Sequence, residues 1–505
     1  MLAKLKSFGL TGLSGYPVSV EVDIHGGIPG FEIVGLADTA VKESKSRVKL
    51  AIKNSGFNYP IGKIVVNLAP ADTKKEGSIF DLAIAIGILA VVKEVTLSEA
   101  KKYLYIGELS LDGQLRKVNG LLPTLISARE QGYDNVIISQ ENVPEAQFVA
   151  GMNVYPAESL RAVVEHLTGE KPIEKLVTRD WAPNDLQDSP NDMKYIKGQF
   201  FARRAMEIAV AGGHNILMIG SPGSGKTMLA KAVPTIMPDL TFAEALEVAK
   251  IFSVAGELND FVFSRPFRAP HHSASLVSLT GGGSKAKPGE MSMAHNGVLF
   301  LDELPEYPRN VLETLRQPLE DKVITVARAA MTVTYPANFM LVASMNPCPC
   351  GNYGSQVKEC TCTLPQIQKY LARLSGPLLD RIDINIEVDN IDYKDLQSDE
   401  LSESSAEVKK RVDAARRIQS ERFKDEGIYC NAQMGASQIK KYCKTDEKSQ
   451  RLLESCFLKL KLSARAYNRI LKVARTIADL SGEENISSMH VAEAIQYRSN
   501  DILKV

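Results

Sequence analysis

Residues 220–227 read Gly220-Ser221-Pro222-Gly223-Ser224-Gly225-Lys226-Thr227, which matches the phosphate-loop pattern G-x-x-x-x-G-K-T at every fixed position. An apolar segment of strand length, 215–219, precedes this loop, and 228–233 has the pattern of the first turns of a helix. Glycines let successive backbone N–H groups form an anion nest, to which the helix N-terminus adds a positive dipole. We therefore expect Lys226 to bind nucleotide phosphates and Thr227 to ligate Mg²⁺; the alternative is a glycine-rich turn with an incidental lysine.

Two acids follow the next buried strand that the sequence predicts, 298–301. Ligands of a doubly wound sheet lie at the carboxyl ends of its strands. We therefore expect Asp302 to reach the Mg²⁺ and Glu303 to hold the water that attacks the γ-phosphate. The alternative is an acidic pair that only caps a helix near Pro305.

A β-hairpin and a third strand come next. Residues 322–326 and 331–335 alternate apolar and polar side chains on either side of a short turn, with Arg328 near the tip. The strand 339–344 leads to Asn346, whose amide is placed to hold the attacking water or the γ-phosphate. In the alternative interpretation Asn346 only caps the loop that follows it.

Two arginines are candidates for phosphate contact. Arg381 lies on a turn among acids. It is either a finger that neutralises charge on a neighbouring subunit's nucleotide, or it forms a local ion pair with Asp380 or Asp383. Arg465 starts a helical pattern that runs to Leu480, and it is the second candidate.

Length and composition limit the class of protein. The chain has 505 residues, which is too long for one core and favours about three domains. Its 60 basic and 60 acidic residues cancel, so any nucleic-acid surface must be local rather than a global positive field. The longest apolar run, 82–92, is about half the length that crosses a bilayer, and 1–15 has no apolar core of a signal peptide. We expect a soluble, cytoplasmic protein with no membrane partner.

The first predicted domain, 1–167, is a mixed α/β or α+β domain. Its patterns favour strands at 18–24, 63–68 and 135–139 and helices at 38–54 and 81–92. The domain is followed by 168–193, which has the charge, proline and asparagine of a linker and no periodicity. We expect Trp181, the only tryptophan, to anchor this linker to a domain surface rather than to stack on a base.

Part of the first domain resembles the proteolytic domain of Lon-type proteases, which has a ribosomal-S5-like fold. The resemblance is carried by Lys75-Glu76-Gly77-Ser78-Ile79, by 112–115 and by 118–122. The nucleophilic serine of that family falls at Ile79 and its lysine base at Leu122, so the resemblance is to the scaffold only. A working protease would need Ser78 and Lys75 to substitute from adjacent positions.

Four cysteines are clustered in Cys348-Pro349-Cys350 and Cys360-Thr361-Cys362. Four thiolates suit tetrahedral Zn²⁺, although structural zinc sites more often have two to four residues between paired cysteines and here there is one. Zinc ligation and free thiols both remain open. The adjacent His271 and His272 lack the spacing of helical metal ligands, which favours hydrogen bonding within a loop.

The order of these motifs resembles an AAA+ ATPase of the magnesium-chelatase-like branch. The segment Arg265-Pro266-Phe267-Arg268-Ala269-Pro270-His271-His272-Ser273, then Gly281-Gly282-Gly283, and the Lon-like domain together resemble the YifB/ComM family over almost the whole chain. This resemblance implies an ATPase core, 194–390, with a helix-2 insert and a pre-sensor hairpin. It also implies a helical lid, 391–505. Within the core, 195–199 and 202–211 are placed to meet the adenine ring.

The resemblance also implies an activity. It implies a hexameric ring that hydrolyses ATP with Mg²⁺ and moves on branched or single-stranded DNA, promoting branch migration during recombination or natural transformation. The implied roles are the phosphate loop for Lys226 and Thr227, metal and water for Asp302 and Glu303, first sensor for Asn346, finger for Arg381 and second sensor for Arg465. Whether Arg465 acts on its own nucleotide or a neighbour's stays open.

The residues themselves support ATP hydrolysis better than DNA binding. Arg328, Lys285 and Lys287 are candidates for a pore that tracks phosphates, and ordinary solvated loop charge is the equal alternative. A second hypothesis is therefore a chelatase-like or chaperone-like ATPase that remodels a protein partner. A protease is disfavoured by Ile79 and Leu122.

Overall fold

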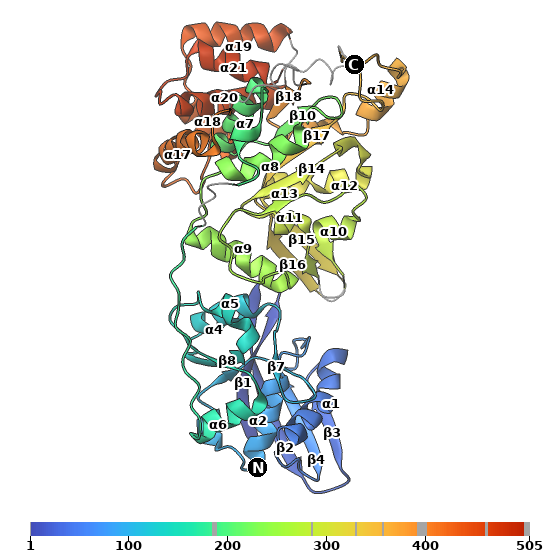
Figure 1. Ribbon diagram of the computed structural model, residues 1–505, viewed down its shortest axis with the longest axis vertical. Coiled ribbons are helices and arrows are strands. Elements are labelled where there is room, and N and C mark those ends of the chain that lie inside the picture. The colour runs from blue at the N-terminus through green and yellow to red at the C-terminus, as the bar shows by residue number, and fades with distance from the viewer. Residues whose placement is uncertain are drawn as a thin grey trace. The chain divides into compact units, whose positions relative to one another are not determined.

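The chain forms two compact units, shown as a computed structural model in Figure 1. The first unit comprises 1–182 and 245–263, and the second comprises 183–244 and 264–505. The structure describes residues 2–183, 189–283, 286–328, 331–355, 358–390, 401–459 and 463–498. None of the helices in these ranges is both long enough and apolar enough to cross a membrane.

The first unit is built on a seven-stranded mixed sheet with the order β3-β4-β2-β1-β5-β8-β9. The antiparallel pair β1–β2 runs in register from Ala3 opposite Val22 to Thr11 opposite Ser14. Alternate side chains of β2, such as Val18 and Val20, are fully buried, as the period of two predicts. The bounds are β1 Ala3–Thr11, β2 Ser14–His25, β3 Gly30–Val34, β4 Lys63–Ala69, β5 Leu104–Tyr105, β6 Glu108–Leu109, β7 Leu115–Arg116, β8 Asn135–Ser139 and β9 Asn153–Ala157.

Helices cover this sheet. Helix α2 is apolar on all sides and buried along its length except at its last residue, and it packs on β1 and β2. The buried Asp81 at its start is held by Arg47 Nε at 2.7 Å, so the charge is paired inside the core. The bounds are α1 Thr39–Asn54, α2 Asp81–Val91, α3 Leu97–Ala100, α4 Leu121–Glu130, α5 Val143–Ala146 and α6 Leu160–Thr168. The predicted strands and helices of this region are confirmed.

The inserted segment 245–263 belongs to the first unit although it lies between two parts of the second. It contains most of α9, Phe242–Ala255. Ser253 Oγ donates to Glu145 Oε2 at 2.6 Å, and the Ser253 carbonyl accepts from the Gly120 N–H at 2.9 Å. Burial raises the pKa of Glu145, while the bond from Ser253 opposes that shift. Trp181 Nε1 donates to the Val262 carbonyl at 3.0 Å, so the tryptophan is anchored to protein as expected.

The second unit contains a five-stranded sheet with the order β11-β14-β17-β10-β18, in which every neighbouring pair is parallel. Ile219 of β10 lies opposite Met345 of β17, and Leu301 of β14 lies opposite Ala343 of β17. The carboxyl ends of these three strands therefore meet at one edge of the sheet. The bounds are β10 Ile216–Ile219, β11 Phe267–Arg268, β14 Val298–Leu301, β17 Met340–Met345 and β18 Ile384–Glu387, which confirms the three predicted strands.

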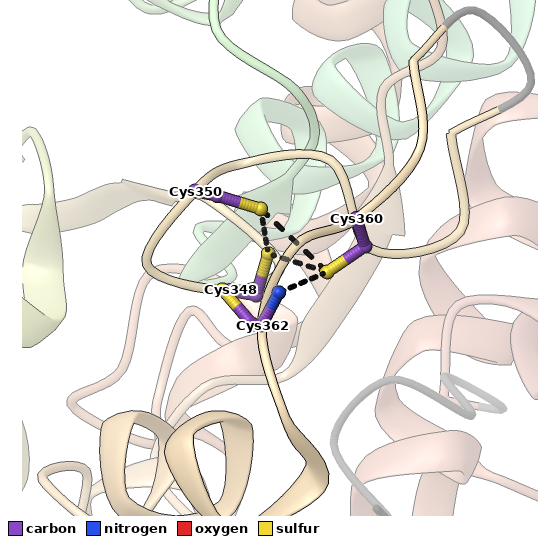
Figure 2. A group of neighbouring side chains, drawn as sticks. All are labelled: Cys348, Cys350, Cys360 and Cys362. Carbon is purple, nitrogen blue, oxygen red and sulfur yellow. Dashed lines mark hydrogen bonds between the residues drawn. The ribbon is translucent and has the colours of Figure 1, made fainter.

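The remaining elements of this core surround the sheet. The predicted hairpin is confirmed as β15–β16. Tyr335 Oη donates to the Ala286 carbonyl at 2.9 Å, which joins the hairpin to the glycine-rich loop that follows Gly281-Gly282-Gly283. Lys285 lies outside the described residues, as does the side chain of Arg328. The bounds are α7 Phe200–Gly212, α8 Lys226–Ile236, α10 Leu276–Thr280, β12 Gly281–Gly282, β13 Lys287–Pro288, α11 Glu290–Met293, α12 Arg309–Thr314, α13 Arg316–Asp321, β15 Val323–Arg328, β16 Met331–Pro336, α14 Leu364–Leu371 and α15 Gly376–Leu379. Between β17 and α14 the described residues form no helix or strand and carry the four clustered cysteines (Figure 2).

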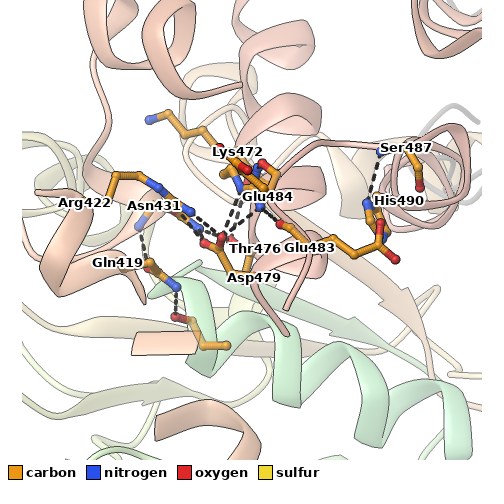
Figure 3. A network of polar contacts seen from close by, with 12 residues as sticks. Gln419, Arg422, Asn431, Lys472, Thr476, Asp479, Glu483, Glu484, Ser487 and His490 are labelled. Carbon is orange, nitrogen blue, oxygen red and sulfur yellow. Dashed lines mark hydrogen bonds and ion pairs between the residues drawn. The ribbon is translucent and has the colours of Figure 1, made fainter. Parts of the chain in front are cut away.

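The C-terminal part is helical, as predicted. Its helices are α17 Ser405–Arg422, α18 Ala436–Tyr442, α19 Glu447–Lys459, α20 Ala464–Leu480 and α21 Ser488–Gln496. A buried carboxylate, Asp479, accepts from Arg422 Nη1 at 2.8 Å, Asn431 Nδ2 at 2.8 Å and Arg475 Nε at 3.0 Å (Figure 3). Two guanidinium groups and an amide thus converge on one side chain.

Replacing Asp479 by Asn should destabilise the second unit strongly, because Arg422 and Arg475 would lose their buried counter-charge. Breaking a buried ion pair in this way costs about 3–5 kcal/mol. Urea unfolding followed by circular dichroism measures the loss.

Glu447→Gln is the matched control, because its partner Arg451 and Glu447 itself are both more than four-fifths exposed. Removing such a surface pair should change the free energy of unfolding by less than about 1 kcal/mol. Equal shifts in both variants would show that Asp479 contributes no more than a surface charge.

Candidate nucleotide site

The predicted phosphate loop connects β10 to α8. Gly223 and Gly225 have φ values of 82° and 90°, a region that side chains other than glycine seldom adopt. A Cβ on Gly220 would lie 2.3 Å from the Val388 carbonyl oxygen, so the loop also needs glycine for close packing. The glycines of the motif are therefore explained by backbone geometry as well as by the expected phosphates.

Lys226 turns back into this loop. Its Nζ donates to the carbonyls of Gly220 at 2.7 Å and Ser221 at 2.8 Å, and it lies 3.5 Å from Asn346 Oδ1. Burial lowers the pKa of Lys226, and the charges of Asp302 and Glu303 oppose that shift. The structure thus brings the expected phosphate-binding lysine and the expected first sensor together.

The Asp302 carboxylate, which follows β14, is held by hydroxyl groups from α8 and β17. Thr227 Oγ1 donates to Asp302 Oδ2 at 3.2 Å, and Ser344 Oγ of β17 donates to Asp302 Oδ1. A hydroxyl and a carboxylate at this edge are oxygen ligands of the kind that Mg²⁺ prefers. Thr227 and Asp302 therefore fit the metal role expected of them, and Ser344 is a positioning group that the sequence motifs did not reveal.

Glu303 makes an unexpected contact. Its backbone has a positive φ of 52°, which is uncommon for a residue other than glycine and is concentrated at functional sites. Its Oε2 lies 3.1 Å from His272 Nδ1. His271 instead hydrogen-bonds through Nδ1 to Ser273 Oγ at 2.8 Å, in agreement with the expected loop bonding. No local pattern relates residues 272 and 303, so sequence reasoning missed this pair.

Residues ahead of the loop also touch it. Gln199 Nε2 donates to the Ser224 carbonyl at 3.3 Å and to the Asp389 carbonyl at 2.5 Å. Ser221 Oγ donates to Asn390 Oδ1 at 2.7 Å. The segment that was expected near the adenine ring therefore borders the phosphate loop, and its contact with a nucleotide base stays a prediction.

The two candidate arginines lie outside this cluster. Arg381 has a 9% exposed side chain whose Nη2 pairs with Glu320, whereas the sequence suggested Asp380 or Asp383 as local partners. Arg465 is exposed in the first turn of α20, and no hydrogen bond joins it to the phosphate loop in the described part of the chain. The finger and second-sensor roles stay predictions.

Asp383 pairs with His214 and Arg469 and not with Arg381. Its Oδ2 lies 3.4 Å from His214 Nδ1 and its Oδ1 lies 3.2 Å from Arg469 Nε. Burial raises the pKa of Asp383, but its contact with His214 and the positive charges of Arg469 and Lys472 outweigh burial and lower the pKa to about 2. The carboxylate therefore ties the strand β18 to helix α20.

Among the described residues of the Lon-like segment, the candidate nucleophile Ser78 and the candidate base Lys75 do not bond to each other. Ser78 Oγ donates to Glu108, while the buried Lys75 Nζ donates to the carbonyls of Pro70 and Thr73. Burial lowers the pKa of Lys75, yet its amine bonds to carbonyls rather than to Ser78. Ile79 and Leu122 are buried in the core. This arrangement agrees with a scaffold that lacks proteolytic chemistry.

The chain is similar to known proteins over almost its whole length. A family model described as magnesium chelatase, subunit ChlI, matches residues 192–396. Models for subunit ChlI of Mg-chelatase and for the ChlI C-terminal part match 20–142 and 402–498. The chain is 46% identical to the competence protein ComM of Haemophilus influenzae, over 99% of this chain and 97% of the relative. It is 44% identical to the uncharacterized protein YifB of Escherichia coli, over 98% of this chain and 96% of the relative. It is 43% identical to the uncharacterized protein YifB of Salmonella typhimurium, over 100% of this chain and 98% of the relative.

Lys226→Ala and Glu303→Gln should separate nucleotide binding from hydrolysis. The alanine variant loses a charged partner of the phosphates and should bind ATP at least about tenfold more weakly. The glutamine variant should bind ATP normally and hydrolyse it about a hundredfold or more slowly, because the water is no longer polarised. Titration with a fluorescent nucleotide and steady-state turnover measure the two effects.

Lys231→Ala, an exposed lysine on the same helix, is the matched control and should alter neither quantity. Equal loss of binding in Lys226→Ala and Glu303→Gln would contradict the division of roles.

His272→Ala should lower the turnover number about tenfold without changing ATP affinity, because a hydrogen bond to the charged Glu303 is worth about 1.5–3 kcal/mol. The neighbouring His271→Ala, which removes the bonds to Ser273 and the ring contact with His272 but not the contact with Glu303, should leave turnover close to wild type. Similar losses in the two variants would mean that the loop, and not the contact with Glu303, is responsible.

Proposed function

Because this chain belongs to the YifB/ComM family of magnesium-chelatase-like AAA+ ATPases, we propose that it is a ring motor that moves on branched or single-stranded DNA and promotes branch migration during recombination or natural transformation. ATP hydrolysis with Mg²⁺ follows from the family. The observation that carries the proposal is the convergence of Lys226, Asn346, Thr227 and Asp302 at the carboxyl ends of neighbouring parallel strands. The cofactors of the proposed reaction are ATP and Mg²⁺.

Each residue of the cluster has one task in the proposed reaction. Lys226 binds the phosphates. Asn346, which contacts Lys226, holds the attacking water or the γ-phosphate. Thr227 and Asp302 hold the metal, which would neutralise charge on the phosphates when bound. Glu303 positions the attacking water and accepts its proton, and its contact with His272 orients the carboxylate.

The ring supplies the remaining positive charge. We assign Arg381 to the nucleotide of the neighbouring copy, and Arg465 to a nucleotide of either copy. In the single chain Arg381 is paired with Glu320, which is 56% exposed. Solvent competes for the exposed Glu320 carboxylate, so Arg381 can exchange this partner for a phosphate of the neighbouring copy. A hexamer is the expected assembly.

The hairpin β15–β16 and the exposed Lys287 support DNA as the substrate on which the ring moves. The hairpin β15–β16 is tied to the glycine-rich loop through Tyr335 and Ala286, and the same loop carries the exposed Lys287. These elements suit a pore whose cations follow a phosphate backbone. One full-length relative is named a competence protein, which favours a role in handling DNA. Remodelling of a protein partner is the second candidate, favoured by family models named after a chelatase subunit.

Forked or single-stranded DNA should raise the steady-state ATPase rate several-fold, and ATP should drive branch migration on a synthetic four-way junction. Lys287→Ala should reduce the stimulation, whereas Lys231→Ala should not. A rate indifferent to every DNA, together with intact basal turnover, would favour the protein-remodelling function instead.

Arg381→Ala should bind ATP yet fail to turn over, because the transition-state charge is left uncompensated. Mixing this variant with excess Lys226→Ala subunits should restore part of the activity, since some interfaces then combine an intact Arg381 with an intact phosphate loop. Mixed rings verified by mass that show no rescue would exclude a finger acting between subunits.

A further inference from the structure

The four clustered cysteines converge on one point (Figure 2). All their Sγ atoms lie within 4.8 Å of one another. The separations are 3.3 Å between Cys348 and Cys350, and 3.6 Å from Cys360 to each of them. Tetrahedral Zn²⁺ with Zn–S bonds of about 2.3 Å places sulfurs about 3.8 Å apart. A disulfide would require about 2.05 Å, so the arrangement matches a tetrathiolate metal site and no disulfide.

The backbone is shaped to support thiolate ligands. The Tyr353 N–H donates to Cys348 Sγ at 3.3 Å, and the Cys362 N–H donates to Cys360 Sγ at 3.4 Å. Such donors stabilise negative charge on sulfur and orient it, as outer-shell hydrogen bonds do in metal sites. Gly351, with a φ of 82°, closes a turn in which its N–H donates to the Cys348 carbonyl at 3.0 Å.

This segment lacks other means of holding its shape. Its described residues between β17 and α14 form no helix or strand, and of the four cysteines only Cys348 is buried. A metal ion that cross-links the two cysteine pairs would supply the stability that a core does not provide, because metal binding free energy becomes folding free energy.

The cysteine segment is attached to the nucleotide site at two positions. A Cβ on Gly351 would lie 2.5 Å from Pro222 Cδ, so its backbone packs directly on the phosphate loop. The Oδ1 of Asn346, two residues before Cys348, lies 3.5 Å from Lys226 Nζ. Helix α14 starts just after Cys362.

We propose that Cys348, Cys350, Cys360 and Cys362 bind one Zn²⁺ and that this ion holds Asn346 and Pro222 in place around the nucleotide phosphates. Binding releases the thiol protons to solvent and involves no change of oxidation state. The inference uses nucleotide binding only, so it stands apart from the proposed action on DNA.

Metal analysis of protein purified without added zinc tests the site. We expect one zinc per chain in the wild type and none in the double variant Cys350→Ser/Cys360→Ser. Cys456→Ser, which alters a cysteine outside the cluster, is the matched control and should keep the full zinc content. Cobalt substituted for zinc should give the thiolate charge-transfer absorption of a four-sulfur site. Metal-free wild-type protein with a native circular dichroism spectrum, or equal zinc in wild type and double variant, would overturn the site.

Nucleotide titration tests the coupling. Removing zinc from the wild type with a chelator should weaken fluorescent-nucleotide binding by about tenfold, within the range that coupling between neighbouring sites spans. Readdition of zinc should restore binding. Gly351→Ala should also bind nucleotide more weakly, because the new Cβ would displace Pro222. Unchanged affinity in both the zinc-free wild type and Gly351→Ala would leave a zinc site without the proposed link. Because no DNA is present, these results do not depend on whether the motor hypothesis holds.

Discussion

The parallel pairing of β17 between β10 and β14 is the constraint on which the second unit depends. Parallel strands place their carboxyl ends at one edge, and this edge receives the phosphate loop from β10, Asp302 from β14 and Asn346 from β17. Residues that are more than a hundred positions apart thereby come within hydrogen-bonding reach, as for Lys226 and Asn346. A shift in the register of β17 would separate Asn346 from Lys226 and Ser344 from Asp302.

Buried polar groups then fix the helical region to this sheet. From Asp479 the contacts pass to Asn431, then to Thr476 at 3.1 Å, and from Thr476 to His214 at 2.8 Å. His214 reaches Asp383 at the start of β18, close in sequence to Arg381. Unpaired, each of these groups would be costly to bury, so the network specifies one arrangement of the lid on the core.

The inserted segment 245–263 belongs to the first unit although the residues on both sides of it belong to the second. The chain leaves the second unit for the first after Glu244 and returns before Ser264, in addition to the passage near residue 182. Within the first unit the insert is held by a buried carboxylate, Glu145, and by aromatic packing, with the rings of Phe148 and Phe261 4.3 Å apart. The ATPase sequence therefore supplies part of the fold of the N-terminal unit.

The sequence by itself determined the phosphate-loop motif, several of the strands and helices, and the order of Asp302, Glu303 and Asn346, because glycine spacing and apolar periodicity are local signals. Only the tertiary structure decided that His272 meets Glu303, that Glu320 pairs with Arg381 and that four cysteines with an unusual spacing share one centre. Such pairs join distant segments whose approach depends on packing and not on any pattern of neighbouring residues. Periodicity could place each segment in a strand, a helix or a loop, but the choice of partner required the folded chain.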